Sequence, residues 1–128
     1  MARPKSKHPT ELELEILKIL WRAKPLTGRQ VRDALTEFRD LAYTSVMTIM
    51  GIMEDKGYVR RKKQGSSYVY SARIKQETTT RRMLLDLVER AYDGSVTSAV
   101  VNLLETSDIQ SQELDQLREL IRKKRNSK

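Results

Sequence analysis

The chain has 128 residues, of which 38% are hydrophobic and 33% charged, with no cysteine and a formal net charge of +8. This length suits one domain, or one small domain with an appended module. The lack of cysteine excludes disulfides, thiolate metal sites and cysteine nucleophiles, and no apolar run is long enough to cross a membrane. We therefore expect a helix-rich cytoplasmic protein.

The positive charge is confined to the first part of the chain. Residues 1–75 hold 16 Lys+Arg against 8 Asp+Glu, whereas residues 76–128 hold 9 of each. Between Lys56 and Lys75 there are seven basic residues and no acidic one. A basic block followed by a neutral part predicts a polyanion-binding module joined to a module with another role.

The N-terminal part predicts two capped helices after a short tail. Residues 1–9 form a basic tail that we expect to be flexible. Thr10 and the glutamate three residues later have capping-box spacing and open a helix, in which Trp21 is expected to anchor the core. A second helix begins at Thr27, and Gln30 stands three residues later at the spacing of a second capping box. The glutamates of the first helix are interpreted as dipole complements and surface charge: Glu11, Glu13 and Glu15.

The stretch from Ala42 to Gly57 predicts a third helix. Its apolar residues recur at three- and four-residue spacing from Val46 to Met53, while its other face is rich in hydroxyl groups and nearly free of charge. The second and third helices, joined by a brief connection, have the proportions of a helix-turn-helix. The predicted DNA contacts from this recognition helix are Tyr43, Thr44, Ser45, Met47 and Thr48.

After Gly57 the apolar pattern alternates with a period of two, which predicts a two-stranded hairpin that turns near Gly65. Four consecutive basic residues, Arg60 to Lys63, favour contact with phosphates over an ordinary solvated loop. The hairpin is therefore interpreted as the wing of a winged helix-turn-helix. Its predicted DNA contacts are Arg60, Arg61, Lys62, Lys63, Gln64, Ser66 and Ser67.

Three short helices with apolar stripes are predicted after residue 75. Some 50 residues are too few for a sizeable private core, so we expect these stripes to be buried against a second copy of the chain. A two-fold dimer would also place two recognition helices on one face of DNA. The alternative is a monomer in which these helices fold back on the first half. The predicted dimerisation residues are Met83, Leu84, Leu87, Val88, Val100, Leu103, Leu104, Leu117 and Leu120.

Four segments carry a family resemblance: Ala42 to Thr48, Lys56 with Gly57, Tyr68 to Tyr70, and Tyr92 to Ser95. Together they resemble the penicillinase and methicillin-resistance repressors, of the BlaI/MecI type with copper-responsive (CopY-type) relatives. The resemblance implies a winged-helix domain over residues 10–74 and a three-helix dimerisation domain over residues 75–128. It also implies a homodimer that represses antibiotic-resistance genes through a palindromic operator, often with TACA and TGTA half-sites.

The resemblance further implies an inducing signal. In several members of that family a membrane-bound zinc metalloprotease, signalled by a β-lactam, cuts the repressor within its dimerisation domain. The matching bond is Asn102–Leu103, where cleaved relatives have an aromatic residue after the asparagine, so Leu103 departs from the pattern. Ile52 stands where arginine is common. An uncleaved winged-helix regulator that answers another signal is the alternative.

No enzymatic site, metal or cofactor is expected. His8 is the only histidine, so no histidine-based triad or multi-histidine metal site can form, and no phosphate-binding glycine loop is present. Two further alternatives stay open. One is a nonspecific nucleic-acid-binding protein, because the recognition face offers no arginine, asparagine or glutamine for bidentate base contacts. The other is a protein–protein adaptor that uses the winged helix as a scaffold.

Overall fold

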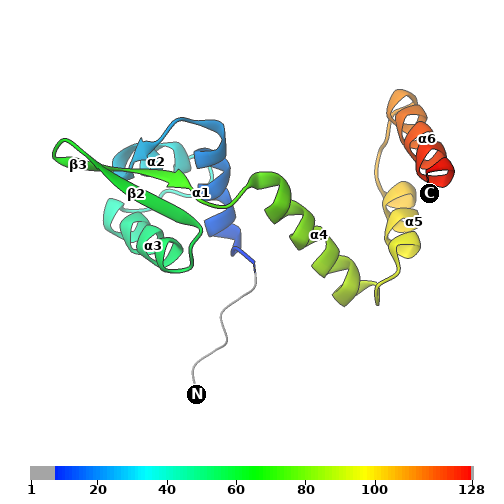
Figure 1. Ribbon diagram of the computed structural model, residues 1–128, viewed down its shortest axis with the longest axis horizontal. Helices are drawn as coiled ribbons and strands as arrows, with labels where there is room; N and C mark the ends of the chain where they lie inside the picture. The colour runs from blue at the N-terminus through cyan, green and yellow to red at the C-terminus, as the bar shows by residue number, and fades with distance from the viewer. Residues whose placement is uncertain (1–7, 128) are drawn as a thin grey trace, which may run out of the picture. The chain divides into compact units, whose positions relative to one another are not determined.

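The computed structural model describes residues 8–127, which contain six helices and a three-stranded antiparallel sheet (Figure 1). The predicted class, mostly α with a small β-hairpin, is confirmed. Most of the basic tail predicted over residues 1–9 lies outside the described residues. No helix in the described chain is long and apolar enough to span a bilayer. The elements are α1 (Glu11–Arg22), β1 (Leu26–Thr27), α2 (Gly28–Leu35), α3 (Tyr43–Asp55), β2 (Val59–Gln64), β3 (Ser67–Ala72), α4 (Gln76–Ala91), α5 (Val96–Thr106) and α6 (Ser111–Asn126).

The first three helices and the base of the hairpin share one hydrophobic core. The helical stripes predicted from residue spacing point inward, so that Ile16, Val31 and Met50 are fully buried. Trp21 packs against this core, and its indole Nε1–H donates to the backbone oxygen of Ile74 at 2.9 Å. The buried core residues are Ile16, Leu17, Leu20, Val31, Leu35, Val46, Met50, Met53, Val59 and Tyr70.

Both predicted capping boxes are present. Thr10 Oγ1 accepts a hydrogen bond from the backbone N–H of Glu13 at 3.2 Å, and Glu13 Oε1 accepts one from the backbone N–H of Thr10 at 2.9 Å. Thr27 and Gln30 exchange the same two bonds at 3.2 and 2.9 Å. Because a first helical turn leaves its N–H groups unpaired, these bonds fix where α1 and α2 begin.

The interpretation of Glu13 as a surface charge is wrong. Its side chain is 5% exposed, and its two carboxylate oxygens accept from Lys56 Nζ at 3.2 and 2.9 Å. Lys56 caps the end of α3, so the ion pair ties the first turn of α1 to the last turn of α3. The two residues are 43 positions apart, and no local pattern connects them.

A third strand joins the predicted two-stranded hairpin, in the order β1-β3-β2. β1 is only two residues long, which is too short to show an alternating pattern, and for that reason the sequence did not predict it. Leu26 of β1 pairs with Tyr70 of β3. Gly65 adopts a φ of 62° at the hairpin turn, as expected of a residue without Cβ. The element order α1-β1-α2-α3-β2-β3 is that of a winged helix.

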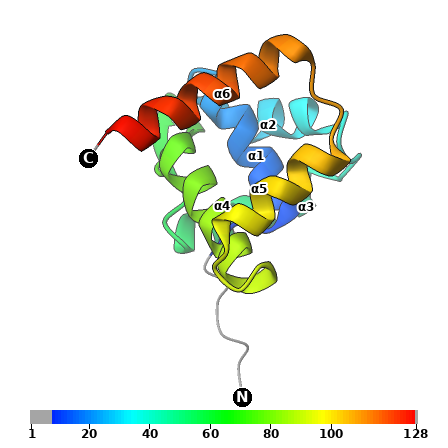
Figure 2. The ribbon, with the colours of Figure 1, turned by 90° about the vertical axis from the view of Figure 1, so that its right-hand side faces the viewer.

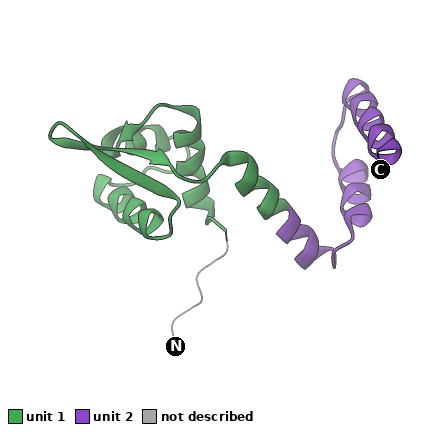
Figure 3. Ribbon diagram, in the orientation of Figure 1, with its two compact units in different colours: residues 1–84 green, residues 85–128 purple. Residues whose placement is uncertain are grey.

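The described chain divides into two compact units between Leu84 and Leu85, inside α4 (Figure 3). The sequence placed a boundary at residue 74, before this helix begins. The first turns of α4 belong with the winged helix, where Thr79 is buried. The second unit comprises the rest of α4 with α5 and α6 (Figure 2), and Ala99 is its one buried residue among those described.

Candidate nucleic-acid interface

The first two turns of α3 present a polar, uncharged face. The side chains of Tyr43, Thr44, Ser45 and Thr48 are exposed, whereas Val46 on the opposite side is fully buried. The Thr48 hydroxyl donates to the carbonyl oxygen of Thr44 at 3.0 Å, which leaves its oxygen available as an acceptor. This face therefore offers methyl groups and hydroxyl oxygens, which suit the methyl group of thymine and the donor groups of base edges.

Met47 differs from the other predicted contacts because it is only half-exposed. Its sulfur and terminal methyl lie against Gly28 at the start of α2, where an added Cβ would collide with the sulfur. Gly28 is itself buried. The two helices thus approach closely at this point, and Met47 packs between them as well as reaching the surface.

Two arginines flank this face, and each is stacked on an aromatic ring. The guanidinium carbon of Arg29 in α2 lies 4.6 Å from the ring centroid of Tyr43, and that of Arg61 in β2 lies 4.4 Å from the ring centroid of Tyr68. Arg61 Nε is also 3.5 Å from a carboxylate oxygen of Glu54 in α3. Stacking restricts a guanidinium without neutralising it, so both arginines are held in position; Arg29 keeps its charge for an anion, while Arg61 shares its charge with Glu54.

A cavity of about 390 Å³ lies between α2, α3 and the hairpin, and both stacked arginines line it. The sequence did not identify Arg29 or Tyr68 as site residues. The available signals were the place of Arg29 in the first turn of α2 and the place of Tyr68 opposite Lys63 in the hairpin. Neither position alone identifies a site residue, because the cavity forms only when α2, α3 and the hairpin pack together. The lining residues are Thr27, Gly28, Arg29, Tyr43, Met47, Arg61, Ser66, Ser67, Tyr68 and Tyr70.

Strand pairing divides the basic run of the wing between two faces. Arg61 lies opposite Tyr70, which is buried in the core, so Arg61 and Lys63 share the face turned toward the helices. Arg60 and Lys62 alternate onto the other face. The turn end of the hairpin extends beyond the helices (Figure 1). The remaining predicted wing residues are exposed: Gln64, Ser66 and Ser67.

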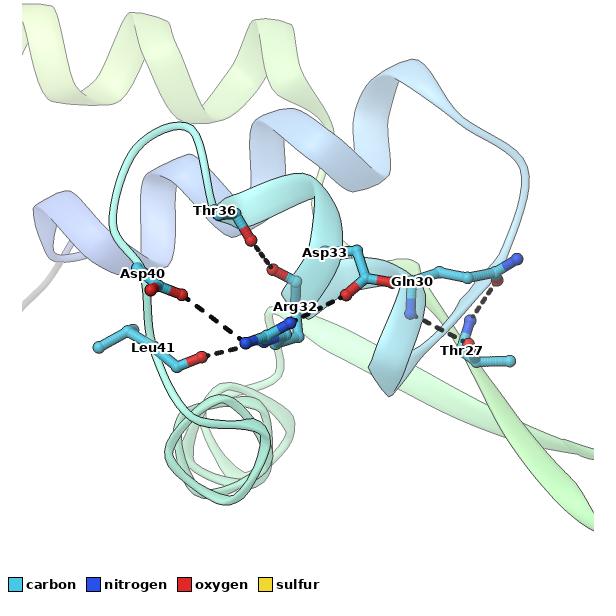
Figure 4. Close-up of polar contacts among 7 residues, drawn as sticks. All are labelled: Thr27, Gln30, Arg32, Asp33, Thr36, Asp40 and Leu41. Atoms are coloured by element: carbon cyan, nitrogen blue, oxygen red, sulfur yellow. Dashed lines mark hydrogen bonds and ion pairs between the residues drawn. The ribbon is translucent and has the colours of Figure 1, made fainter.

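Arg32 fixes the connection between α2 and α3 (Figure 4). Its Nε donates to the backbone oxygen of Leu41 at 3.1 Å, and its terminal nitrogens lie 3.2 Å from Asp33 Oδ1 and 3.7 Å from Asp40 Oδ1. The Thr36 hydroxyl closes the end of α2 by donating to the carbonyl oxygen of Arg32 at 3.2 Å. Since α3 begins two residues after Leu41, this network ties α2 to the residues that lead into α3.

The predicted dimerisation residues lie on apolar faces that the chain itself leaves uncovered. Leu84, Leu103 and Leu120 are 57%, 56% and 61% exposed, and α6 has no buried residue at all. Contiguous exposed apolar surface is uncommon in monomeric proteins, and these faces are therefore candidates for an interaction site. Met83 and Val88 are half-buried. The others are exposed: Leu84, Leu87, Val100, Leu103, Leu104, Leu117 and Leu120.

The candidate cleavage bond Asn102–Leu103 lies in the middle of α5. Asn102 Nδ2 donates to the hydroxyl of Tyr92 at 2.7 Å, and the Thr106 hydroxyl donates to the carbonyl oxygen of Asn102 at 2.6 Å. Asn102 is therefore held by its side chain and by its backbone oxygen. A protease needs an extended substrate, so cutting this bond requires local unwinding of α5.

The described residues hold no group of three histidine, aspartate or glutamate side chains that could bind a metal ion. His8 lies instead at a second cavity, of about 250 Å³, next to the start of α1 and the start of α4. That cavity shares no lining residue with the one between α3 and the hairpin.

Comparison with known proteins agrees with this architecture. A sequence model of a family described as penicillinase repressor matches residues 9–123. The transcriptional regulator BlaI of Mycobacterium tuberculosis is 33% identical over 84% of this chain and 78% of its own length. The penicillinase repressor of Bacillus licheniformis is 23% identical over 93% of each chain. The solution structure of the DNA-binding domain of the repressor BlaI shares the fold, with a TM-score of 0.50 and 22% identity over 58% of this chain and 90% of that one.

Proposed function

The chain belongs to the penicillinase repressor family, and we propose that it acts as a homodimer which represses its target genes from a palindromic operator in double-stranded DNA. Family membership identifies a DNA-binding transcriptional repressor and not an enzyme. The operator, the dimer and the inducing signal are the proposed elements. We place this activity in the cytoplasm, where the operator DNA lies.

The observation that carries the proposal is the exposed hydroxyl face of α3 between two stacked arginines. Thr44, Ser45 and Thr48 supply base contacts through methyl groups and hydroxyl oxygens, with Tyr43 and Met47 beside them. Arg29 and Arg61 bind the flanking phosphates and so set the register of the helix in the major groove.

Base contacts of this kind are individually weak. The exposed end of the face adds an apolar group, Ile52, which is 46% exposed and lies one turn beyond Thr48. No arginine, asparagine or glutamine side chain in α3 makes a bidentate base contact, because α3 has none. Specificity therefore comes from several methyl and shape contacts, while the wing supplies much of the affinity through Arg61 and Lys63.

The apolar faces of the second unit support the dimer. Most of the predicted dimerisation residues are exposed to solvent in the single chain, which costs about 25 cal/mol per Å² relative to burial. Residues 76–128, which include this unit, also carry no net charge, which suits an interface between two copies better than it suits a polyanion. A two-fold axis through this unit would give each operator half-site one winged helix.

Binding to DNA from the protein's own promoter region tests the specific repressor against its rivals. We expect fluorescence anisotropy to show at least about a thousandfold preference for that DNA over random duplex at one salt concentration. Equal affinity for both would identify the nonspecific nucleic-acid-binding protein instead. No binding to either duplex at any salt concentration would identify the adaptor.

For the inducing signal we propose proteolysis at Asn102–Leu103 by a membrane-bound zinc metalloprotease that senses a β-lactam or another envelope stress. The cut would separate α6 and the end of α5 from the rest, and so divide the apolar faces of the second unit. Mass spectrometry of the repressor from β-lactam-treated cells should find a fragment that begins at Leu103. Release from the operator with the chain intact would favour the uncleaved regulator that answers another signal.

A further inference from the structure

The second cavity, which lies in the first unit next to the C-terminal end of α3, has the composition of a ligand site. Its volume is about 250 Å³. Apolar groups from the ring of Tyr58 and from Ile74 and Pro9 form part of its wall, while Lys75 and Arg82 stand at its edge. No aspartate or glutamate lines it. The cavity thus combines a partly apolar wall, which also includes His8, Thr78 and Thr79, with two cationic side chains and no acidic one.

This cavity is separate from the proposed DNA interface. Tyr58 immediately precedes β2, whereas the turn at Gly65 follows the far end of that strand. Six residues of strand span about 20 Å, so the cavity lies about that far from the wing tip. A molecule bound there would not compete with DNA for Arg61 or Lys63.

The two cations at the edge are not committed to other groups. Among the residues that the structure describes, neither Lys75 nor Arg82 forms an ion pair. Arg81, the neighbour of Arg82, by contrast lies 2.7 Å from a carboxylate oxygen of Glu77. Two unpaired cations beside an apolar wall favour an anion that also has an apolar part.

Two further groups in the wall can orient such a ligand. Thr79 is 7% exposed and brings a hydroxyl to the cavity. Burial raises the pKa of the Tyr58 phenol, with the charge on Lys56 acting in the opposite direction and that on Glu13 adding to the rise, so this hydroxyl stays protonated at neutral pH. Both hydroxyls can donate a hydrogen bond to a carboxylate oxygen.

We propose that this cavity binds a compact organic anion, with an apolar body of about one ring and a carboxylate held by Lys75 and Arg82. The size agrees, since a cavity of about 150 Å³ accommodates benzene and drug-sized ligands occupy roughly 300–1,000 Å³. The charge agrees as well, because guanidinium and ammonium groups are the usual partners of carboxylates. The walls come from α4 and the connection before it, from the residue before β2 and from the residues that precede α1, so the ligand would bridge these segments.

The chain contains its own reporter for this site. Trp21 is the only tryptophan, and its indole N–H donates to the backbone oxygen of Ile74, which lines the cavity. In a spectrum of the ¹⁵N-labelled full chain, one indole resonance therefore reports on the cavity wall. The readout does not depend on DNA, so failure of the proposed repressor function would leave it unaffected.

Benzoate is the probe, titrated against the full chain at constant ionic strength. We expect a saturable shift of the Trp21 indole resonance with a Kd at or below about 10 mM, as suits a small ligand. Benzyl alcohol, which has the ring but no charge, and phosphate, which has charge but no ring, should each bind at least about tenfold more weakly. An equal response to either one, or no saturable shift with benzoate, would overturn the proposal.

Variants of α4 and its preceding residue locate the carboxylate. Lys75→Gln with Arg82→Gln should raise the Kd for benzoate at least about tenfold, because both ionic partners are lost. Arg81→Gln is the matched control, since it removes one positive charge from the adjacent position outside the cavity, and its Kd should stay within about twofold of the wild-type value. Equal Kd values in the double variant and the control would show that benzoate binds elsewhere.

Discussion

Lys62 and Lys63 are neighbours in the chain, yet strand alternation places them on opposite faces of the hairpin. Lys63 shares the face of Arg61, which turns toward α3, and we therefore expect it to contact a phosphate when α3 lies in the groove. Lys63→Ala should weaken binding to specific and random DNA alike and reduce the slope of log affinity against log salt by about 1.

Lys62→Ala is the matched control for the wing, because it removes the same charge from the other face. Its effect on the salt slope should be clearly smaller, and the double variant should resemble Lys63→Ala. Anisotropy titrations with operator and random duplexes at three or more salt concentrations measure both slopes. A larger effect of Lys62→Ala would mean that the outer face of the hairpin meets the DNA.

Because of Tyr58, we expect the free energy of unfolding to decrease at alkaline pH. Burial raises the pKa of its phenol in the folded chain, whereas the unfolded phenol ionises near pH 10. Above about pH 10 the unfolded state therefore loses its proton first, and the stabilisation that is complete at lower pH is lost as the pH rises. Tyr58→Phe cannot ionise, so its urea midpoint should fall less than that of the wild type between about pH 9 and pH 11.

The control for Tyr58 is Tyr68→Phe, which removes a phenol that is 43% exposed. This variant should keep the alkaline decline of the wild-type protein. The cation–π contact between Lys56 Nζ and the Tyr58 ring, at 5.7 Å, survives in Tyr58→Phe and so does not distort the comparison. A Tyr58→Phe variant that declined as steeply as the wild type would show that other groups govern alkaline unfolding.

At the scale of elements, the buried pair of Glu13 and Lys56 holds the ends of α1 and α3 together. Glu13→Ala removes the acceptor for both Lys56 and the backbone N–H of Thr10, and leaves Lys56, which is 17% exposed, without its partner. We expect a loss of about 3 kcal/mol in the free energy of unfolding by urea. Glu11→Ala, in the same helical turn but exposed, should change it by no more than about 0.5 kcal/mol.

A second variant separates the charge pair from the space that it fills. Glu13→Leu with Lys56→Met replaces the pair by apolar side chains, which is often close to neutral in buried sites. The double variant should therefore be more stable than Glu13→Ala. Equal losses for Glu13→Ala and Glu11→Ala would show that the pair contributes little.

The elements that the sequence predicted are those whose signals are local. The helix caps at Thr10 and Thr27 and the apolar stripes each depend on residues only a few positions apart in the sequence. Both features were confirmed. β1 was not predicted, because a strand of two residues is too short to show an alternating pattern of apolar residues. The stacking of Arg29 on Tyr43 was not predicted for another reason: it depends on how α2 and α3 pack and not on the sequence of either helix alone.

The same division holds for the candidate site. The hydroxyl face of α3 could be predicted because helical period alone brings Thr44 and Thr48 to one side. The two faces of the wing could not be assigned, because a slip of one residue in register exchanges every side chain between them. The observed pairing of Arg61 with Tyr70 decides that question.

For the whole molecule, charge and apolar surface are divided along the chain. The excess of basic residues lies within residues 1–75, while the largest run of exposed apolar side chains begins at Leu84. The proposed phosphate-binding surface and the proposed self-association surface therefore do not share residues. This division suits a repressor whose affinity for DNA depends on joining two copies.

Leu117 tests that dependence. Leu117→Asp places a charge on an apolar face of α6 and should give monomers in sedimentation velocity, with operator affinity reduced about a hundredfold because the two half-sites are no longer bound together. Gln116→Asp introduces the same charge at the adjacent exposed position and should remain dimeric. Both variants should bind a single half-site with the same affinity, since the winged helix is untouched. An intact Leu117→Asp dimer would exclude this face of α6 from the interface, and a monomer with full operator affinity would show that repression does not require the dimer.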